Sequence, residues 1–358
     1  MDDFPFFIGK SSCLARHLTK DVYKRLCNLQ TPNGFSFQQA IQCGVDHPDL
    51  LVGVLAGDEQ SYETFSELFD AIIEDYHNGF KTSDKHTTDV DASKIIDGEL
   101  DPKYILSSRI RTSRNIRGYC LAPFITRWDR RKLHELIVDA LTCLSGEFQG
   151  RHFALRDLNQ AVQKQLIDDH ILFRPPVTGL FTSGGLARDF PDGRGIWFTE
   201  KKDFIVWINE EDHIRIIAME TGGNMKQLFG RFVRGLSEVE LHFQGHSGTE
   251  FMWQDHLGYI SASPSNLGTG LRCSVLIKLQ HLGNDRRFRE VCEKLRLEIR
   301  GTHGEHTESA DGVYDISNRD RLGKSEVELV NSVIEGVRLL IKMETMLEKG
   351  LTIDELIP

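Results

Sequence analysis

Four arginines lie close together in the segment SSRIRTSRNIRGY, at Arg109, Arg111, Arg114 and Arg117. Alternate residues of a β-strand face the same side, so Arg109 and Arg111 are predicted to project together. Two guanidinium groups on one face match the oxygens of a phosphate group. The alternative is a basic strand edge that faces solvent.

A second segment, DFIVWINEEDHIRIIAM, combines acids with an arginine. If its strand pattern continues, Glu211, His213 and Arg215 share one face while Glu210 and Asp212 point away. The acid on that face could contact a cationic acceptor, and the arginine an anionic donor. The alternative is a surface ion pair.

Two further segments are rich in small residues. SPSNLGTGLR (263–272) allows close approach of its backbone to an anion and ends at Arg272. It lacks the P-loop spacing, and the chain has no G-x-G-x-x-G motif, so an ordinary turn is the alternative. RGTHGEHTES (300–309) places glycines between Arg300 and Glu305, which suits a mobile lid or an ordinary surface loop.

Taken together, these segments indicate phosphoryl transfer. Its transition state needs cations around the transferred phosphoryl group and acids that orient the nucleophile. The candidate cations are Arg109, Arg111, Arg215, Arg272 and Arg300, and the candidate acids are Glu211 and Glu305.

The elements that must position these residues divide the chain in two. Residues 1–95 show helical periodicity, as in 15–26 and 62–76, and a polar stretch at 81–98 has the composition of a linker. Strands are predicted at 104–110, 204–208, 214–219 and 275–279, with amphipathic helices at 129–144 and 326–347. We therefore predict an α+β protein, with a small all-α domain (1–95) before a larger α+β domain (96–358).

Composition narrows the function further. The chain has 358 residues and a net charge of −10, which disfavours general nucleic-acid binding. No apolar run approaches the roughly 20 residues of a membrane helix, and the N-terminus MDDFPFFIGK lacks the features of a secretory signal, so a cytoplasmic location is expected. Seven cysteines without C-x-x-C spacing indicate free thiols and no metal site.

Long, ordered motifs give a more specific indication. They are LIDDH (166–170), GGLARDFPDGRGIW (184–197), WINEEDH (207–213), GGNMKQ (222–227), PSNLGTGLR (264–272) and DISNRDRLG (315–323). Over nearly its whole length the chain resembles the phosphagen (guanidino) kinases. The resemblance implies a mainly antiparallel sheet flanked by helices in the catalytic domain, as in the glutamine-synthetase-like fold. It also implies ATP with Mg²⁺ held mainly by phosphates and water, and a homodimer.

The resemblance also implies roles for individual residues. The residues implied to bind the nucleotide are Ser107, Ser108, Arg109, Ile110, Arg111, Phe198, Arg215, Arg272, Cys273, Ser274, Val275, Leu276, Arg300, Gly301, Thr302, His303, Gly304 and Glu305. Those implied to bind the guanidine are Leu51, Val52, Gly53, Val54, Leu55, Glu211, Ser263 and Glu305. Catalysis is implied for Glu211, Glu305, Arg215, Arg272 and Arg300.

The segment GVDHPDLLVGVLAGDE, which resembles the guanidine-specificity loop, favours L-arginine as the acceptor. It is shorter than in family members that phosphorylate creatine, and a short loop leaves room for a larger guanidine. Glu305 stands where the arginine-specific members have a substrate-contacting glutamate. Leu55 departs from the tyrosine usual in those members, so taurocyamine, lombricine and creatine remain alternatives.

Three further positions depart from the family pattern. Ser263 replaces a reactive cysteine, and a hydroxyl, neutral at pH 7, polarises a guanidine only weakly. Phe198 and Leu276 replace histidines that commonly flank adenine. These changes predict a reduced rate, and they keep a catalytically impaired nucleotide-binding paralogue as an alternative.

Overall fold

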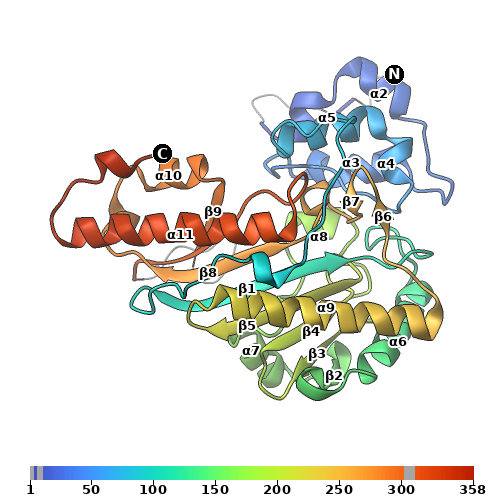
Figure 1. The fold of residues 1–358 in the computed structure, drawn as a ribbon. Helices are drawn as coiled ribbons and strands as arrows, with labels where there is room; N and C mark the ends of the chain where they lie inside the picture. The colour runs from blue at the N-terminus through green and yellow to red at the C-terminus, as the bar shows by residue number, and fades with distance from the viewer. Residues whose placement is uncertain (1–3, 6–10, 302–310) are drawn as a thin grey trace.

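The computed structural model describes residues 4–5, 11–301 and 311–358. Its first layer is a group of short helices (Figure 1): α1 (Cys13–His17), α2 (Lys20–Leu26), α3 (Phe37–Asp46), α4 (Ser61–Thr64) and α5 (Ser66–Tyr76). The continuous helix predicted at 15–26 is therefore wrong. The chain leaves helical geometry at Leu18, and the Thr19 side chain accepts a hydrogen bond from the Val22 N–H and starts a new helix.

The larger part of the molecule is built on an eight-stranded sheet. Its strands are β1 (Ile105–Arg114), β2 (Gly150–Ala154), β3 (Gly195–Thr199), β4 (Phe204–Ile208), β5 (Ile214–Thr221), β8 (Arg272–Lys278), β9 (Leu297–Arg300) and β10 (Val313–Asn318). Their order is β2-β3-β4-β5-β1-β8-β10-β9, and every pairing is antiparallel. A separate hairpin pairs β6 (Trp253–Gln254) with β7 (Gly258–Tyr259). The α+β fold class is confirmed.

The remaining described helices are α6 (Arg127–Thr142), α7 (Gln160–Asp168), α8 (Gly179–Ser183), α9 (Met225–Ser247), α10 (Phe288–Lys294) and α11 (Glu326–Glu348), of which α6, α9 and α11 are long. Single 3₁₀ turns are η1 (Ala92–Lys94), η2 (Gly146–Phe148), η3 (Leu155–Asp157), η4 (Pro264–Asn266), η5 (Leu282–Asn284) and η6 (Asp354–Leu356). None of the described helices combines the length and apolarity that a bilayer crossing requires.

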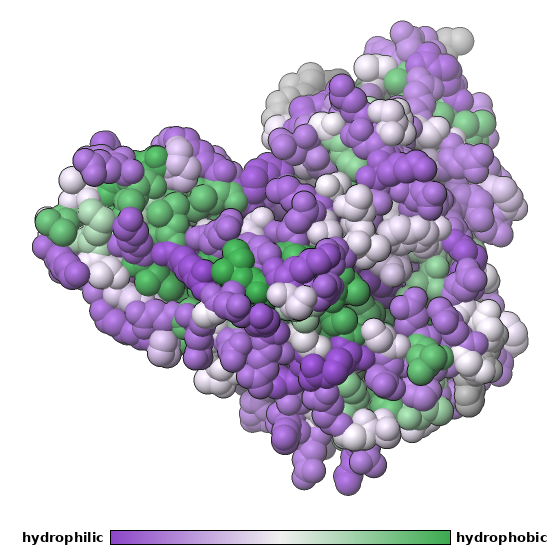
Figure 2. All heavy atoms as spheres, in the orientation of Figure 1, coloured by the Kyte–Doolittle hydropathy of each residue, from purple (hydrophilic) through white to green (hydrophobic). Residues whose placement is uncertain are grey.

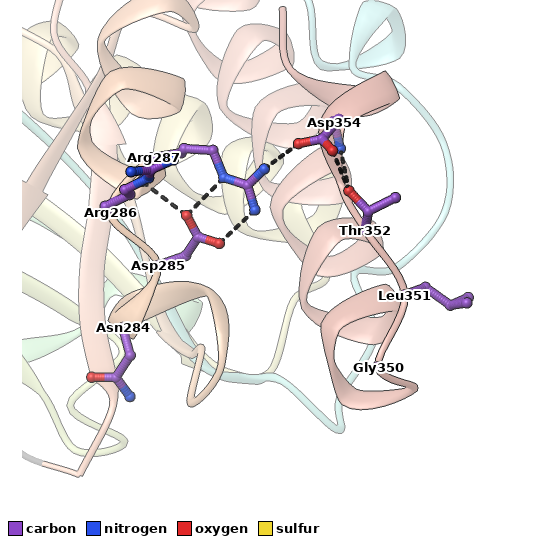
Figure 3. Close-up of a pocket in the computed structure, with 8 residues that line it drawn as sticks. All are labelled: Asn284, Asp285, Arg286, Arg287, Gly350, Leu351, Thr352 and Asp354. Atoms are coloured by element: carbon purple, nitrogen blue, oxygen red, sulfur yellow. Dashed lines mark hydrogen bonds and ion pairs between the residues drawn. The ribbon is translucent and has the colours of Figure 1, made fainter.

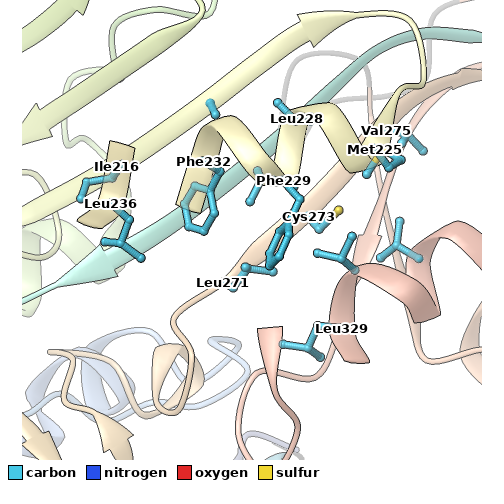
Figure 4. Packing of buried hydrophobic residues seen from close by; sticks show 14 of the residues in the cluster. Ile216, Met225, Leu228, Phe229, Phe232, Leu236, Leu271, Cys273, Val275 and Leu329 are labelled. Carbon is cyan, nitrogen blue, oxygen red and sulfur yellow. The ribbon is translucent and has the colours of Figure 1, made fainter. Parts of the chain in front are cut away.

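The main core lies between one face of the sheet and helices α6, α9 and α11. Phe229 and Phe232 of α9 are fully buried there together with Cys273 of β8 and Leu329 of α11 (Figure 4). Alternate strand residues supply this face, so the residues between them must face the other way.

The opposite face of the sheet is only partly covered. Over β3 to β5 it packs against the segment 155–173, with Trp207 and Ile217 in the shared apolar cluster. On β1 and β8, the arginines alternate with the core residues along each strand, so they project from this opposite face.

The core of the small helical layer continues into the large part of the chain. Phe65 and Phe69 share one buried cluster with Met252, Ile260 and Leu322. The two parts therefore share apolar contacts, although Figure 2 shows the surface hollowed between the helical layer and the α10–α11 end.

Candidate active site

Strand register brings together arginines that are far apart in the sequence. On β1, Arg111 lies opposite Arg272 of β8, and Arg109 lies opposite Ser274. Arg215 enters from β5, on the other side of β1, where it pairs with Ser113. The prediction that Arg109 and Arg111 project together is consistent with this register.

Arg300 joins the group from the edge strand β9. It lies opposite Asp315 of β10, and Asp315 also makes an ion pair of 3.2 Å with Arg272 Nη2. One carboxylate thus lies between two of the guanidinium groups. Arg272, Arg300 and Arg111 lower the pKa of Asp315, although its burial acts in the opposite direction.

The two arginines of β1 have an unfavourable local environment for positive charge. Burial, followed by the charge of Arg272, lowers the pKa of Arg109 to about 10. Burial and the neighbouring arginines also lower the pKa of Arg111. Among the described residues, the buried Nε and Nη2 atoms of Arg109 have no hydrogen-bond partner. These donors would gain most from an anion.

Trp207 of β4 forms an apolar wall beside the arginines. The guanidinium carbon of Arg109 lies 5.3 Å from its ring centre and that of Arg215 lies 5.7 Å away. The indole Nε1 donates to the Ile171 carbonyl at 2.6 Å, which fixes the ring. An aromatic face can hold a cation without neutralising it, so the guanidinium groups stay available to an anion.

The acids lie in a turn, so the strand pattern does not continue through Glu211 and His213, and the common face that depended on it does not form. β4 ends at Ile208 and β5 begins at Ile214, so Glu210 does not point away from Arg215. Glu210 binds Arg215 Nη1, and Glu211 Oε2 accepts from Arg215 Nη2 at 3.0 Å. Burial opposes the Arg215 charge, but these two carboxylates outweigh it and raise the Arg215 pKa.

The same turn is fastened to the loop before β8. Asn266 Nδ2 donates to Glu211 Oε1 at 3.1 Å, so both oxygens of Glu211 have a partner. Asp212 Oδ1 accepts from the Ala262 N–H at 3.0 Å and from Ser261 Oγ at 2.9 Å. Asn266, Asp315 and Trp207 are not among the predicted site residues, because their contacts cross between segments that are far apart in the sequence.

Ser263 lies within this loop, buried at 5% exposure. Its hydroxyl shares a hydrogen bond of 2.8 Å with Ser265 Oγ, and its carbonyl accepts from the Asn266 N–H at 3.0 Å. The position is therefore connected to Glu211 through Asn266. In this loop a hydroxyl can polarise a substrate only as a neutral group.

The loop 51–55 lies beside the same segment. The Ala56 N–H donates to the Ala262 carbonyl at 2.8 Å, which joins the end of this loop to the residue before Ser263. The carbonyls of Leu51 and Val52 accept from the N–H groups of Cys13 and Leu14. The Leu51 side chain is 58% exposed, and the side chains that follow Gly53, those of Val54 and Leu55, are buried in apolar clusters.

The side chains of four residues of the predicted nucleotide set face away from the arginines. Ser108, Ile110, Cys273 and Val275 alternate with the arginines and are buried on the face that the helices cover. Ser108 Oγ donates to the Gly222 carbonyl at 2.7 Å, and burial raises the pKa of Cys273. Their side chains hold strands in place and do not reach the arginine face.

The predicted adenine neighbours are also not brought together. Leu276 is on β8 and pairs with Ser107 of β1, whereas Phe198 is on β3 and stacks on Phe153 with ring centres 5.0 Å apart. Four strand spacings separate β3 from β8, roughly 19 Å. Phe198 and Leu276 therefore cannot flank one adenine ring in this arrangement.

Part of the predicted site lies outside the described residues. Thr302, His303, Gly304 and Glu305 fall between 301 and 311, while Arg300 and the buried Gly301 are described.

Two surface hollows help to locate the site. A groove of about 490 Å³ lies at one end of the arginine face and is lined by Ser107, Met219, Ile171 and several charged residues. Met219 pairs with Arg109 across β1 and β5, so the groove is continuous with the arginines. A larger hollow, about 710 Å³, lies between η5 and the C-terminal tail, where Arg287 already binds Asp285 and Asp354 (Figure 3). Its charges satisfy one another, so it is a poor candidate for the site.

An arginine-lined sheet face with half-buried carboxylates at its edge has the features of a phosphoryl-transfer site. Family models define the class more closely. Residues 9–74 match the ATP:guanido phosphotransferase N-terminal domain, and residues 132–347 match the C-terminal catalytic domain. The chain belongs to this family, the phosphagen kinases, which transfer phosphoryl groups between ATP and guanidines.

Individual relatives cover the full chain. It is 57% identical over 357 residues to an arginine kinase of Stichopus japonicus, covering 100% of this chain and 96% of that protein. It is 52% identical to a creatine kinase B-type of Gallus gallus, covering 100% and 95%. A crystal structure of lombricine kinase matches with a TM-score of 0.93 and 46% identity over 99% and 98% of the two chains. A duplicated taurocyamine kinase from Schistosoma mansoni matches with a TM-score of 0.87 and 36% identity over 95% of this chain and 48% of the other.

Proposed function

We propose that this phosphagen kinase transfers the γ-phosphoryl group of ATP to the guanidino group of L-arginine, reversibly, giving phosphoarginine and ADP. The higher identity to an arginine kinase, 57% against 52% for a creatine kinase, carries the choice of acceptor. The short loop at 51–55 and Glu305 support it through the family resemblance.

In this proposal the arginines bind the phosphates. Arg109 and Arg111, which the described structure leaves without a carboxylate partner, receive the phosphate chain together with Arg272. Arg215 and Arg300 complete the set. Fixed guanidinium groups neutralise the charge that spreads over the phosphoryl oxygens in the transition state, without having to reorganise.

Glu211 orients the acceptor. Its carboxylate lies between Arg215 and Asn266, so it stands at the edge of the phosphate-binding face. A guanidinium paired with this carboxylate would hold its nitrogen in line with the γ-phosphorus. Glu305 is proposed to take the second contact with the guanidinium.

The residues of the arginine face are mostly cations, which cannot ligate a metal. We therefore propose that Mg²⁺ arrives with ATP and is held by phosphate oxygens and water. Mg²⁺ supplies further charge neutralisation at the phosphates. The groove beside Ser107 and Met219 is proposed to hold the nucleoside, with Leu276 on the neighbouring strand.

A panel of guanidines tests the acceptor. ADP formation from Mg-ATP would be measured with saturating arginine, creatine, glycocyamine, taurocyamine and lombricine. We expect a clear preference for arginine. A preference for another guanidine would retain the phosphotransfer mechanism and refute the acceptor assignment.

Ser263 and Leu276 favour a second candidate, an impaired paralogue that binds ATP without turnover. Calorimetric titration with ATP distinguishes the two. ATP binding with no ADP formation from any guanidine of the panel would support this second candidate and refute the first.

The family resemblance also supports a cytoplasmic homodimer. Light scattering of the purified protein would measure its mass, and a mass of one chain would refute the dimer. Fractionation of the cells that produce the protein would test the compartment.

A further inference from the structure

Asn115 is a buried side chain at the junction of the segments that carry the site. It directly follows β1, the strand of Arg109 and Arg111, and is 1% exposed. A primary amide has one acceptor oxygen and two donor hydrogens, so it can join several segments at once. The contacts of Asn115 show which segments it joins.

The amide of Asn115 holds the turn between β4 and β5 at two consecutive residues. Asn115 Oδ1 accepts from the His213 N–H at 2.9 Å, and Asn115 Nδ2 donates to Asp212 Oδ1 at 2.7 Å. Both residues directly follow Glu211 in the chain. The main-chain position of Glu211 is therefore tied to the end of β1 by two hydrogen bonds from a single side chain.

The same side chain also reaches the loop before β8. Asn115 Nδ2 donates to the Ile260 carbonyl at 2.9 Å. Asp212 Oδ1 accepts two hydrogen bonds from the same loop, from Ser261 Oγ at 2.9 Å and from the Ala262 N–H at 3.0 Å. The pair formed by Asn115 and Asp212 therefore joins β1, the turn and this loop.

Burial makes this junction costly to disturb. Asn115, Asp212, His213 and Ile260 are all buried. Without the Asn115 side chain, the His213 N–H and the Ile260 carbonyl would lose a partner, and Asp212 would lose one donor. Buried polar groups without a partner are unfavourable, so we expect the turn at 209–213 to shift until these groups regain partners.

A shift of the turn would affect the two substrates differently. Glu211 lies within the turn, whereas Arg109 and Arg111 lie inside β1, which pairs with β5 on one side and β8 on the other. Displacement of a reacting group by about 1 Å can cost about 100-fold in rate. The guanidine would therefore lose its alignment while the phosphate-binding face stays in place.

We propose that Asn115 is a positioning residue for the acceptor guanidine. Through Asp212 and His213 it sets where Glu211 stands relative to the phosphate-binding arginines. This inference rests on the proposed function, in which Glu211 pairs with the guanidinium. Asn115 acts through the turn and not on a substrate, because its oxygen and its nitrogen are both bonded within the protein.

The test compares Asn115→Ala with the unchanged protein in steady-state assays of ADP formation, with the best acceptor of the guanidine panel. We expect the KM for the guanidine to rise and its kcat/KM to fall by about tenfold or more, with the KM for ATP within a factor of about two. A purely structural role would lower the folded fraction and the apparent kcat. It would leave both KM values unchanged, because only folded molecules set them.

A double-mutant cycle with Glu211→Gln tests whether the effect passes through Glu211. In the Glu211→Gln background, Asn115→Ala should change kcat/KM by no more than about twofold, because the carboxylate that Asn115 positions is already absent. Equal fold-changes in both backgrounds would overturn the proposal. So would a kcat/KM for the guanidine that Asn115→Ala alone leaves within a factor of about two.

Asn331→Ala is the matched control. Asn331 of α11 also joins two segments, since its Oδ1 accepts from the Ile96 N–H at 2.9 Å and its Nδ2 donates to the Lys94 carbonyl at 3.0 Å. This variant should leave the KM for the guanidine unchanged. If circular dichroism shows that Asn115→Ala is unfolded, Asn115→Asp replaces it in the same cycle. That variant keeps the size of the side chain and turns a carboxylate oxygen toward Asp212, so the same fold-changes are expected.

The test separates this proposal from the choice of acceptor. A preference for another guanidine would refute the acceptor assignment, and the same comparison would be made with that guanidine. If no guanidine is turned over, calorimetric affinities for arginine and for ATP replace the two KM values. Absence of arginine binding, or an arginine affinity that Asn115→Ala leaves unchanged, would then overturn the proposal.

Discussion

At the scale of single residues, Glu211 is the side chain with the most specific position. Both of its carboxylate oxygens are held, one by Arg215 and one by Asn266. Glu211→Gln keeps the shape and removes the charge, so the acceptor guanidinium loses its ionic partner. We expect kcat to fall by about 100-fold or more, measured as ADP formation with arginine.

The matched control for this change is Glu238→Gln, at an exposed acid of α9. It should retain full activity. Retention of kcat within a factor of about two in Glu211→Gln would show that the carboxylate charge plays no part in orienting the acceptor.

A second prediction for a single residue concerns Ser263. Its hydroxyl is hydrogen-bonded to Ser265, in the loop that also holds Asn266. Ser263→Cys introduces a group that can ionise beside a cationic guanidine, and we expect a higher rate and a changed dependence on anions. Steady-state rates with and without added chloride check this, with Ser332→Cys on α11 as the control. An unchanged or lower rate in Ser263→Cys would refute the prediction.

At the scale of elements, period-two alternation predicted β1, β4, β5 and β8 and placed Arg109 and Arg111 on one face, but it did not predict β2, β3, β9 or β10. The predicted strands at 204–208 and 214–219 match the end of β4 and the start of β5, but the common face considered for Glu211, His213 and Arg215 required the strand pattern to continue between them. Residues 209–213 are all polar and form the turn instead.

Period-two alternation also could not show that Phe198 is four strands away from Leu276, since strand order depends on non-local pairing. Spacing alone also missed Asn266, whose contact with Glu211 spans 55 positions of the sequence.

Helix α11 depends on its N-terminal cap. The Ser325 side chain accepts from the Glu328 N–H, and the Glu328 side chain accepts from the Ser325 N–H. Ser325→Ala removes one half of this capping box and should lower the free energy of unfolding by about 1 kcal/mol. Urea denaturation measures it. Ser332→Ala, within the same helix, is the control and should change stability little, because alanine is the better helix former.

At the scale of the whole molecule, buried neutral histidines predict how stability depends on pH. Burial lowers the pKa to about 4 for His77, His86, His134 and His213, which lie in different parts of the chain. The unfolded chain takes up these protons near pH 6.5 and the folded chain only near pH 4. Their stabilisation is therefore complete above pH 6.5 and is lost as the pH falls toward 4.

The measurement is urea denaturation at a series of pH values between 7 and 4. Each histidine should contribute a slope of up to about 1.4 kcal/mol per pH unit within that window. His77→Gln keeps a donor for the Pro264 carbonyl, which His77 Nε2 contacts at 2.8 Å. It should reduce the slope of the free energy of unfolding against pH by the contribution of one proton. His281→Gln, at an exposed position, is the control. An identical slope in His77→Gln would contradict the assignment.

The shared apolar cluster of the helical layer also constrains how acceptor specificity could be exchanged between relatives. Phe65 and Phe69 pack with Met252, Ile260 and Leu322, and the Ala56 N–H binds the Ala262 carbonyl. A chimera that replaced residues 1–95 alone would combine core residues from two different proteins in one apolar cluster. The segments that must be exchanged together to change acceptor choice are therefore discontinuous in the sequence: residues 1–95, residues 252–267 and the residues around 322. Recombination at a single crossover would separate residues that pack against one another.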